Sequence, residues 1–317
     1  MPIIEAHGLS RTFKTRGGTV EAVRGVDLTV EPGEIVGFLG PNGAGKTTTL
    51  RMLTTLLKPT AGTATVTGVD LLGDPSAVRA KIGYVSQAGG ADPASKVEEE
   101  LVLQAQLYRI PTPEARKSAA TLMEQLELTG LEQRASKTLS GGQRRRLDVA
   151  LGLVHAPSLV FLDEPSTGLD PQSRSNLWDH IRRIRDGLGT TIFLTTHYLD
   201  EADALCDRIL VIDHGVIVAE GTPEELKRRI SGDVVTIGVG GASEKAAELF
   251  AVHPGVRDVG AVDHTIRLTV EHGDEALVGL MRVLDGAGVP IESIQLARPT
   301  LDDVFLTLTG RSLREDS

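Results

Sequence analysis

Hydrophobic and polar residues alternate in short runs from Ile3 to about Val66, and glycine or proline pairs such as Gly17-Gly18 and Pro32-Gly33 separate these runs. A period of two predicts strands with one buried face, so antiparallel strands are expected here. One run, residues 35–39, is apolar throughout. Such a run predicts a strand that is buried on both faces.

The pattern changes in the middle of the chain. Residues 94–135 repeat apolar positions at helical spacing, which predicts a helical segment. Two more apolar runs, 159–162 and 191–194, lie on either side of the amphipathic stretch 173–186. Strand, helix and strand in that order predict a parallel sheet.

A hairpin is predicted next, from Arg208 to Glu220, with its turn at His214-Gly215. Thr222-Pro223-Glu224-Glu225 then combines an N-cap residue, proline at the first helical position and glutamate at the third. This capping box predicts a short helix that ends at Ile230.

Ser231-Gly232-Asp233 is the expected domain boundary, which divides the chain into domains 1–230 and 231–317, with a helical subdomain at about 88–155. The second domain has the order strand, helix, strand, strand, helix, strand, predicted at 234–239, 243–250, 256–262, 265–270, 274–284 and 291–296. That order is typical of a small α+β ferredoxin-like unit. In a last segment, Leu301 to Gly310, four apolar residues share one helical face: Leu301, Val304, Phe305 and Leu308. This face is expected to dock either on the sheet of its own domain or on a partner. Packing within the chain alone is the alternative.

Charge and cysteine content narrow the class of protein. The 317 residues include 33 basic and 43 acidic side chains, and the net charge of -10 argues against nucleic acid as a partner. Residues 231–317 hold 14 acidic and 7 basic side chains, which indicates a solvated acidic face or an interaction surface. The single cysteine, Cys206, excludes an internal disulfide.

No apolar run approaches the ~18 residues that cross a bilayer, so the chain is expected to be soluble and to reach a membrane only through a partner.

The segment Gly40-Pro41-Asn42-Gly43-Ala44-Gly45-Lys46-Thr47 matches the phosphate-binding pattern G-x-x-x-x-G-K-[ST]. It follows the buried strand 35–39 and precedes a predicted helix, which is the context that the pattern requires; a plain glycine-rich turn is the alternative. Backbone N–H groups of such a loop surround phosphates, its lysine reaches the β and γ phosphates, and its threonine hydroxyl binds magnesium. The loop therefore predicts a nucleoside triphosphate site.

Asp163-Glu164 ends the buried run 159–162. A carboxylate at that position is suited to magnesium, and its neighbour can polarise a water molecule for attack on the γ phosphate. Two adjacent carboxylates at a buried strand end are costly without cations, so a purely structural role is the weaker interpretation.

The segment Leu139-Ser140-Gly141-Gly142-Gln143 identifies the family. Together with the phosphate loop, Gln87, Asp163-Glu164, the segment Ser166 to Asp170, and His197, in that order, it makes residues 1–230 resemble the nucleotide-binding subunit of an ATP-binding cassette (ABC) transporter. The fold class that this resemblance implies is α/β: a P-loop (RecA-like) parallel-sheet core with an N-terminal antiparallel β-subdomain and a helical subdomain.

The resemblance also implies roles for single residues. Gly40 to Thr48 would bind ATP with Asp170, and two subunits would pair head to tail so that Ser140, Gly141, Gly142 and Gln143 close on the partner's ATP. Glu164 would be the general base, with Gln87 and His197 as further catalytic residues. Thr47, Gln87 and Asp163 would bind Mg²⁺.

Several residues carry weaker signals. Phe13 matches the aromatic residue that stacks on adenine in this family, although a core or surface aromatic is the alternative. Arg144-Arg145-Arg146 is interpreted as a solvated helix face, and Trp178 and Cys206 as packing residues.

The segment from Arg298 to Gly310 is similar to the C-terminal end of daunorubicin-resistance-type ATPase subunits. This resemblance implies an ATPase, active as a homodimer, that powers a separate ABC-2-type permease at the cytoplasmic face of the membrane and exports a hydrophobic drug, antibiotic or lipid-like compound. The alternatives are a cassette ATPase that acts on ribosomes or nucleic acid, and a nucleotide-sensing scaffold without turnover. The presence of Glu164 argues against the scaffold, and the absence of a second cassette argues against the ribosome- or DNA-acting class.

Overall fold

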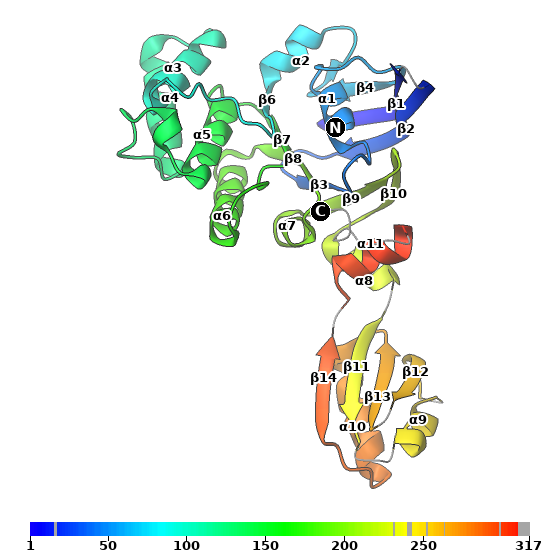
Figure 1. Ribbon diagram of the computed structural model, residues 1–317. Coiled ribbons are helices and arrows are strands. Elements are labelled where there is room, and N and C mark those ends of the chain that lie inside the picture. The colour runs from blue at the N-terminus through cyan, green and yellow to red at the C-terminus, as the bar shows by residue number, and fades with distance from the viewer. Residues whose placement is uncertain are drawn as a thin grey trace. The chain divides into compact units, whose positions relative to one another are not determined.

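A computed structural model of the chain describes residues 1–15, 18–230, 232–239, 243–251, 253–262, 264–297 and 299–309. Gly17, Ser231, Arg298 and Gly310, which entered the sequence predictions, lie outside these residues. The chain divides into two units: the first runs from Met1 to Glu220, and the second begins at Gly221. Each unit is described by itself (Figure 1).

The N-terminal strands form the predicted antiparallel sheet, in the order β2-β1-β4-β5. Strand β1 (Ile4–Thr15) pairs with β2 (Gly18–Val30) on one side and with β4 (Ala61–Val66) on the other. The short strand β5 (Val69–Asp70) extends the sheet beyond β4. Register shifts at Ala6 to Leu9, at Leu9 to Arg11 and at Arg11 to Thr12 interrupt the pairing of β1 with β2.

A six-stranded sheet in the order β10-β9-β3-β8-β7-β6 is the centre of the first unit. Its strands are β3 (Ile35–Leu39), β6 (Ile82–Val85), β7 (Leu159–Asp163), β8 (Thr191–Thr196), β9 (Arg208–Asp213) and β10 (Val216–Gly221). The five strands from β6 to β9 in this order run parallel to one another. Every residue of β3, β7 and β8 is buried, as their apolar runs predict.

Helices surround this sheet and build the helical subdomain. They are α1 (Lys46–Leu53), α2 (Pro75–Lys81), α3 (Val97–Leu107), α4 (Thr112–Gln125), α5 (Gly141–Leu153), α6 (Pro171–Leu188) and α7 (Leu199–Leu205), with a 3-10 turn at Ser136–Thr138. Figure 1 shows α3, α4 and α5 gathered on the side of the unit away from β1 and β2. The parallel core, the antiparallel subdomain and the helical subdomain confirm the expected fold class.

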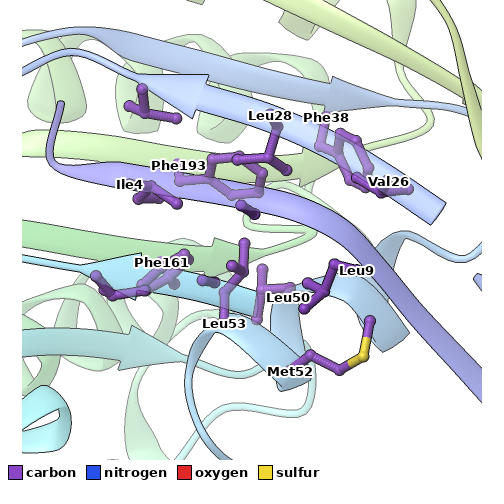
Figure 2. Close-up of a cluster of buried hydrophobic side chains, with 14 of the residues drawn as sticks. Ile4, Leu9, Val26, Leu28, Phe38, Leu50, Met52, Leu53, Phe161 and Phe193 are labelled. Carbon is purple, nitrogen blue, oxygen red and sulfur yellow. The ribbon is translucent and has the colours of Figure 1, made fainter. Parts of the chain in front are cut away.

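The core of the first unit lies where the two sheets meet α1. Phe38, Phe161 and Phe193 come from neighbouring parallel strands, and their rings pack 5.6–5.7 Å apart through Phe193. Ile4 and Leu28 of the antiparallel sheet face them in Figure 2, together with apolar residues of α1. Because α1 begins at the phosphate loop, this packing fixes the loop to both sheets.

Cys206 supports the same core, as predicted for a packing residue. It is buried, and an added Cβ at Gly37 of β3 would lie 2.5 Å from its Sγ. Only glycine leaves room for this close approach.

The second unit contains a four-stranded antiparallel sheet in the order β12-β13-β11-β14. Its elements are β11 (Asp233–Gly238), α9 (Ser243–Ala251), β12 (Val256–Val262), β13 (Thr265–Val270), α10 (Gly273–Gly286) and β14 (Ser293–Ala297). This is the predicted order of elements, with the first strand in the middle of the sheet. Alternate residues such as Ile237, Ile266 and Leu268 are fully buried with Phe250 and Leu280 of the helices.

The boundary between the units lies ten residues before the expected position, Ser231. Helix α8 (Pro223–Ile230) belongs to the second unit because it packs on the last helix, α11 (Leu301–Thr309). The capping box itself is confirmed: Thr222 Oγ1 accepts a 3.2 Å bond from Glu225 N, and Glu225 Oε2 accepts a 2.9 Å bond from Thr222 N.

This contact also decides where the apolar face of α11 lies. Leu301, Val304 and Phe305 are at most 3% exposed. Helix α11 packs on α8, so the face packs within the chain. Leu308, which was predicted for the same face, is 38% exposed.

Candidate active site

The phosphate loop links β3 to α1 in the way that its motif predicts. Gly45 has φ +108° and Gly43 has φ +79°, a backbone region that favours glycine. An added Cβ at Gly45 would lie 2.5 Å from the carbonyl oxygen of Ala22, and one at Gly40 would lie 2.2 Å from that of Ile212. The backbone of the loop therefore packs closely against β2 at Gly45 and against β9 at Gly40. Asn42 and Gly43 are exposed at its tip, and Thr48 follows Thr47 in the first turn of α1.

Lys46 folds back over this loop. Its Nζ donates bonds of 2.8 Å to the carbonyl oxygen of Gly40 and 3.0 Å to that of Pro41, and it lies 3.4 Å from Glu164 Oε1. Burial lowers the pKa of Lys46, although Glu164 and Asp163 oppose this shift. The site thus holds a nearly dehydrated cation beside the loop.

Asp163, at the carboxyl end of β7, lies next to the first turn of α1. Its Oδ1 accepts bonds from the Thr47 hydroxyl at 3.0 Å and from the Thr195 hydroxyl at 2.8 Å. The carboxylate is 1% exposed. A buried carboxylate and a threonine hydroxyl at this separation are the hard oxygen ligands that Mg²⁺ prefers, so the residues fit the expected ion.

Glu164 is the centre of the site. Its Oε2 accepts bonds from Gln87 Nε2 at 3.0 Å and from the Thr167 hydroxyl at 3.2 Å, and His197 Nδ1 lies 3.2 Å away. Burial opposes ionisation of this side chain, but His197 and Lys46 outweigh burial and lower the pKa of Glu164 to about 2. Glu164 is therefore a carboxylate at neutral pH.

The backbone of Glu164 is unusual. Its φ of +44° lies in the left-handed region, which costs a residue with a side chain of order 1–3 kcal/mol. The Glu164 N–H is bonded to both the hydroxyl and the carbonyl oxygen of Thr195. Strained backbone of this kind is concentrated at functional sites, where surrounding contacts hold it in place.

The segment Ser140 to Gln143 forms the N-terminus of α5. Ser140 and Gln143 make a capping box, with Ser140 Oγ 3.2 Å from Gln143 N and Gln143 Oε1 3.0 Å from Ser140 N. Ser140 and Gly141 are exposed, so the first N–H groups of this helix are open to a ligand.

The segment Ser166 to Asp170 lies beside the start of that helix, since an added Cβ at Gly141 would lie 3.9 Å from Leu169 Cδ2. Asp170 is the N-cap of α6 and accepts a 2.9 Å bond from Ser173 N. An added Cβ at Gly142 would lie 3.1 Å from Ser173 Oγ. Within one chain, the structure thus gives Asp170 a capping role beside the exposed end of α5.

Phe13 lies on β1 opposite Val20 of β2 and is half-buried. The Arg11 guanidinium lies over its ring, 4.7 Å from the centroid, and donates a 2.7 Å bond to the carbonyl oxygen of Lys58. Val20 lines an open depression with Gly43 of the phosphate loop. Phe13 therefore lies on β1 opposite one of the β2 residues that line the depression beside the loop.

Arg145 was missed by the sequence interpretation. It is only 7% exposed, whereas the run Arg144-Arg145-Arg146 was expected to be a solvated helix face. Its guanidinium donates bonds to the carbonyl oxygens of Ser86, Asp163, Glu164 and Pro165. The helical spacing carried a signal: Arg145 lies four positions before the apolar, buried Val149, and residues four apart share one face of a helix.

Two family models match the chain, one within each of its two units. A model described as ABC transporter matches residues 23–167, and one described as ATP-binding protein DrrA1-3-like, C-terminal domain, matches residues 221–309. The chain is 44% identical to the daunorubicin/doxorubicin resistance ATP-binding protein DrrA of Streptomyces peucetius, over 97% of this chain and 92% of that protein. It is 32% identical to the linearmycin resistance ATP-binding protein LnrL of Bacillus subtilis, over 99% and 100%.

Among solved structures, the ATP-binding cassette MJ0796, a dimer in a post-hydrolysis state bound to ADP and Pi, is similar with a TM-score of 0.63 and 26% identity. The match covers 69% of this chain and 98% of that one.

Proposed function

Because the chain belongs to the ATP-binding cassette family of transporter ATPases, in the group of drug-resistance ATP-binding proteins, we propose that its ATPase activity powers an exporter through the site around Glu164. The observation that carries this proposal is one cluster of side chains from separate elements. Thr47, Gln87 and His197 converge there on the buried Lys46, Asp163 and Glu164.

The phosphate-binding part of the proposal rests on the loop and on Lys46. The loop from Gly40 to Thr48 would surround the β and γ phosphates with N–H groups, and Lys46 Nζ would exchange its carbonyl partners for phosphate oxygens. Thr47, Asp163 and Gln87 would hold Mg²⁺, which supplies charge neutralisation to the phosphates when it is bound. Phe13 would stack on adenine.

Glu164 is proposed as the general base. Its carboxylate accepts the proton of the attacking water as the bond from that water's oxygen to the γ phosphorus forms, and ADP leaves with the electron pair of the broken bond. Gln87 and His197 both contact Glu164 Oε2, and His197 would also meet the transferred phosphate. The low pKa of Glu164 keeps this group ionised before the water is engaged.

Two copies of the chain are proposed to pair head to tail. Ser140, Gly141, Gly142 and Gln143 present an exposed helix N-terminus, which would close on the γ phosphate bound by the partner's loop. The dimeric state of the similar cassette MJ0796 supports this arrangement. Since both sites are complete in this sequence, a homodimer is proposed.

Complementation tests the shared sites. Ser140→Arg blocks closure at one end of the chain, and Lys46→Met removes the phosphate cation at the other, so each homodimer should lose turnover at both sites. A mixture should recover ATPase activity, because one site per heterodimer keeps both an intact Ser140 and an intact Lys46. Heterodimers that are shown to form but do not recover activity would contradict head-to-tail pairing.

A separate ABC-2-type membrane permease is the proposed partner, which would place the chain at the cytoplasmic face of the membrane. None of the described helices combines the length and the apolarity that a membrane span requires. The names of the relatives, which include daunorubicin, doxorubicin and linearmycin resistance, support a hydrophobic drug, antibiotic or lipid-like compound as the exported substrate. Reconstitution with an ABC-2-type permease tests the proposal: ATP-dependent export supports it, and ATPase activity that the permease never alters contradicts it.

The second unit is proposed to regulate or stabilise the dimer. None of the predicted ATP-site residues lies in it, and its sheet, α9 and α10 form a core of their own. Truncation after Glu220 removes α8 together with its partner α11, whereas truncation after Ile230 would leave α8 without that partner. The shorter chain is expected to bind ATP and to lose dimerisation or coupling to the permease. Full export by the truncated chain would contradict this role.

A further inference from the structure

The buried guanidinium of Arg145 joins three separate segments of the first unit. It donates bonds of 2.7 Å from Nε to Pro165 O, 2.7 Å from Nη1 to Ser86 O, and 3.1 and 3.3 Å from Nη2 to Asp163 O and Glu164 O. All four acceptors are backbone carbonyls. Arg145 itself lies on α5, five positions after Ser140.

The chemistry of this contact favours arginine. A guanidinium has five N–H donors in one plane, so it can bond to carbonyls in several directions, which the compact ammonium of lysine cannot do with the same geometry. A cation that is 7% exposed must be compensated by its partners, and its neighbour Asp148 lies on the same helix. Asp148 Oδ1 accepts bonds from Gly90 N at 2.9 Å and Ala91 N at 3.2 Å.

The contacts of Arg145 stabilise the backbone that carries Gln87 and Glu164. Ser86 immediately precedes Gln87, whose Nε2 bonds to Glu164 Oε2. The strained Glu164 backbone is held at its N–H by Thr195 and at its carbonyl by Arg145. Arg145 therefore touches the backbone on both sides of the Gln87–Glu164 hydrogen bond.

We infer that Arg145 is a positioning residue for ATP hydrolysis, which holds Glu164 and Gln87 in register with the helix that begins at Ser140. Movement of α5 as Ser140 closes on the partner's nucleotide is thereby transmitted to the base in the same chain. This inference rests on the proposed role of Glu164 as the base.

Arg145→Gln and Arg145→Lys test it in the full-length dimer. The control is Arg183→Gln, which removes an arginine that is 61% exposed on α6. Steady-state turnover is measured against ATP concentration, with ATP affinity determined separately and folding followed by circular dichroism.

We expect kcat to fall about 10- to 100-fold for Arg145→Gln and less for Arg145→Lys, because a displacement of about 1 Å at a catalytic group can lower the rate 10²-fold. KM and ATP affinity should stay within about threefold, because none of the phosphate-binding groups is changed.

Two results would overturn the inference. Folded Arg145 variants that turn over at the rate of the control would remove the positioning role, and a loss of kcat matched by an equal loss of ATP affinity would indicate a binding role instead. If Arg145→Gln does not fold, Arg145→Lys alone decides between these outcomes. Glu164→Gln is assayed in parallel: if it keeps full turnover, the proposed base is wrong, whereas its inactivity beside fully active Arg145 variants refutes only the present inference.

Discussion

Replacement of Lys46 by methionine is expected to weaken ATP binding far more than it changes the free protein. The substitution keeps the length of the side chain and removes the cation that the structure places over the phosphate loop. Lys46 is 4% exposed, and its Nζ already has partners: the carbonyls of Gly40 and Pro41 and the carboxylate of Glu164 at 3.4 Å.

The size of the effect follows from those partners. Truncation of one member of a buried, hydrogen-bonded charge pair costs about 2–5 kcal/mol. The lower part of that range applies, because Nζ gives up two carbonyl bonds when it turns to phosphate. A loss of about 2–3 kcal/mol corresponds to about a 30- to 150-fold increase in Kd, at 1.4 kcal/mol per factor of ten.

Isothermal titration with ATP in the presence of EDTA measures this change without hydrolysis. Lys117→Met, which removes an exposed lysine from α4, is the matched control and should bind ATP like the original chain. An affinity for Lys46→Met within about threefold of that control would refute the placement of Lys46 at the phosphates.

Three further substitutions test other parts of the account. Phe13→Ala should weaken ATP binding by about 1–3 kcal/mol, the usual worth of a base–aromatic stack, while Phe13→Tyr and the affinity for inorganic triphosphate stay unchanged; equal losses for ATP and triphosphate would contradict adenine stacking. His197→Ala should raise the pKa of Glu164 from about 2, because burial opposes ionisation and the contact with His197 that offsets it is then lost, so the acid limb of the kcat/KM profile should move to higher pH; an unmoved limb would show that His197 does not act on Glu164. Phe305→Ala, at a side chain that is 1% exposed, should destabilise the second unit by about 3–5 kcal/mol in chemical denaturation without a change in ATP affinity. Leu306→Ala, at a 48% exposed neighbour, is its control, and equal effects of the two would refute the packing of α11 on α8.

The order of the elements could be predicted because the burial of a strand determines which of its positions are hydrophobic. Apolar runs marked the strands that are buried on both faces, and alternation marked the half-exposed strands of both antiparallel sheets. The domain boundary could not be placed as well, since it depends on a contact between α8 and α11, which are about 70 residues apart in the chain. The glycine-containing segment after α8 indicated a boundary, but its sequence does not show to which unit α8 belongs.

The residues of the candidate site could be predicted from motifs, because each motif requires particular side chains at fixed spacing. Lys46, Thr47, Asp163 and Glu164 belong to such patterns, and the structure brings them together. Arg145 acts on backbone carbonyls, which every residue has, so its partners left no pattern of side chains to find. The left-handed backbone of Glu164 was equally hidden, because tertiary hydrogen bonds stabilise it against its local preference.

Glu164 is proposed as the base for ATP hydrolysis. Its most direct test is the rate of phosphate release by Glu164→Gln in the presence of ATP and Mg²⁺, because the amide keeps the size of the side chain and loses the basic oxygen. The rate is expected to fall by at least about 10²-fold, the usual contribution of a general base, while ATP affinity stays within about threefold. A Glu164→Gln dimer that releases phosphate at near the original rate would contradict the proposal.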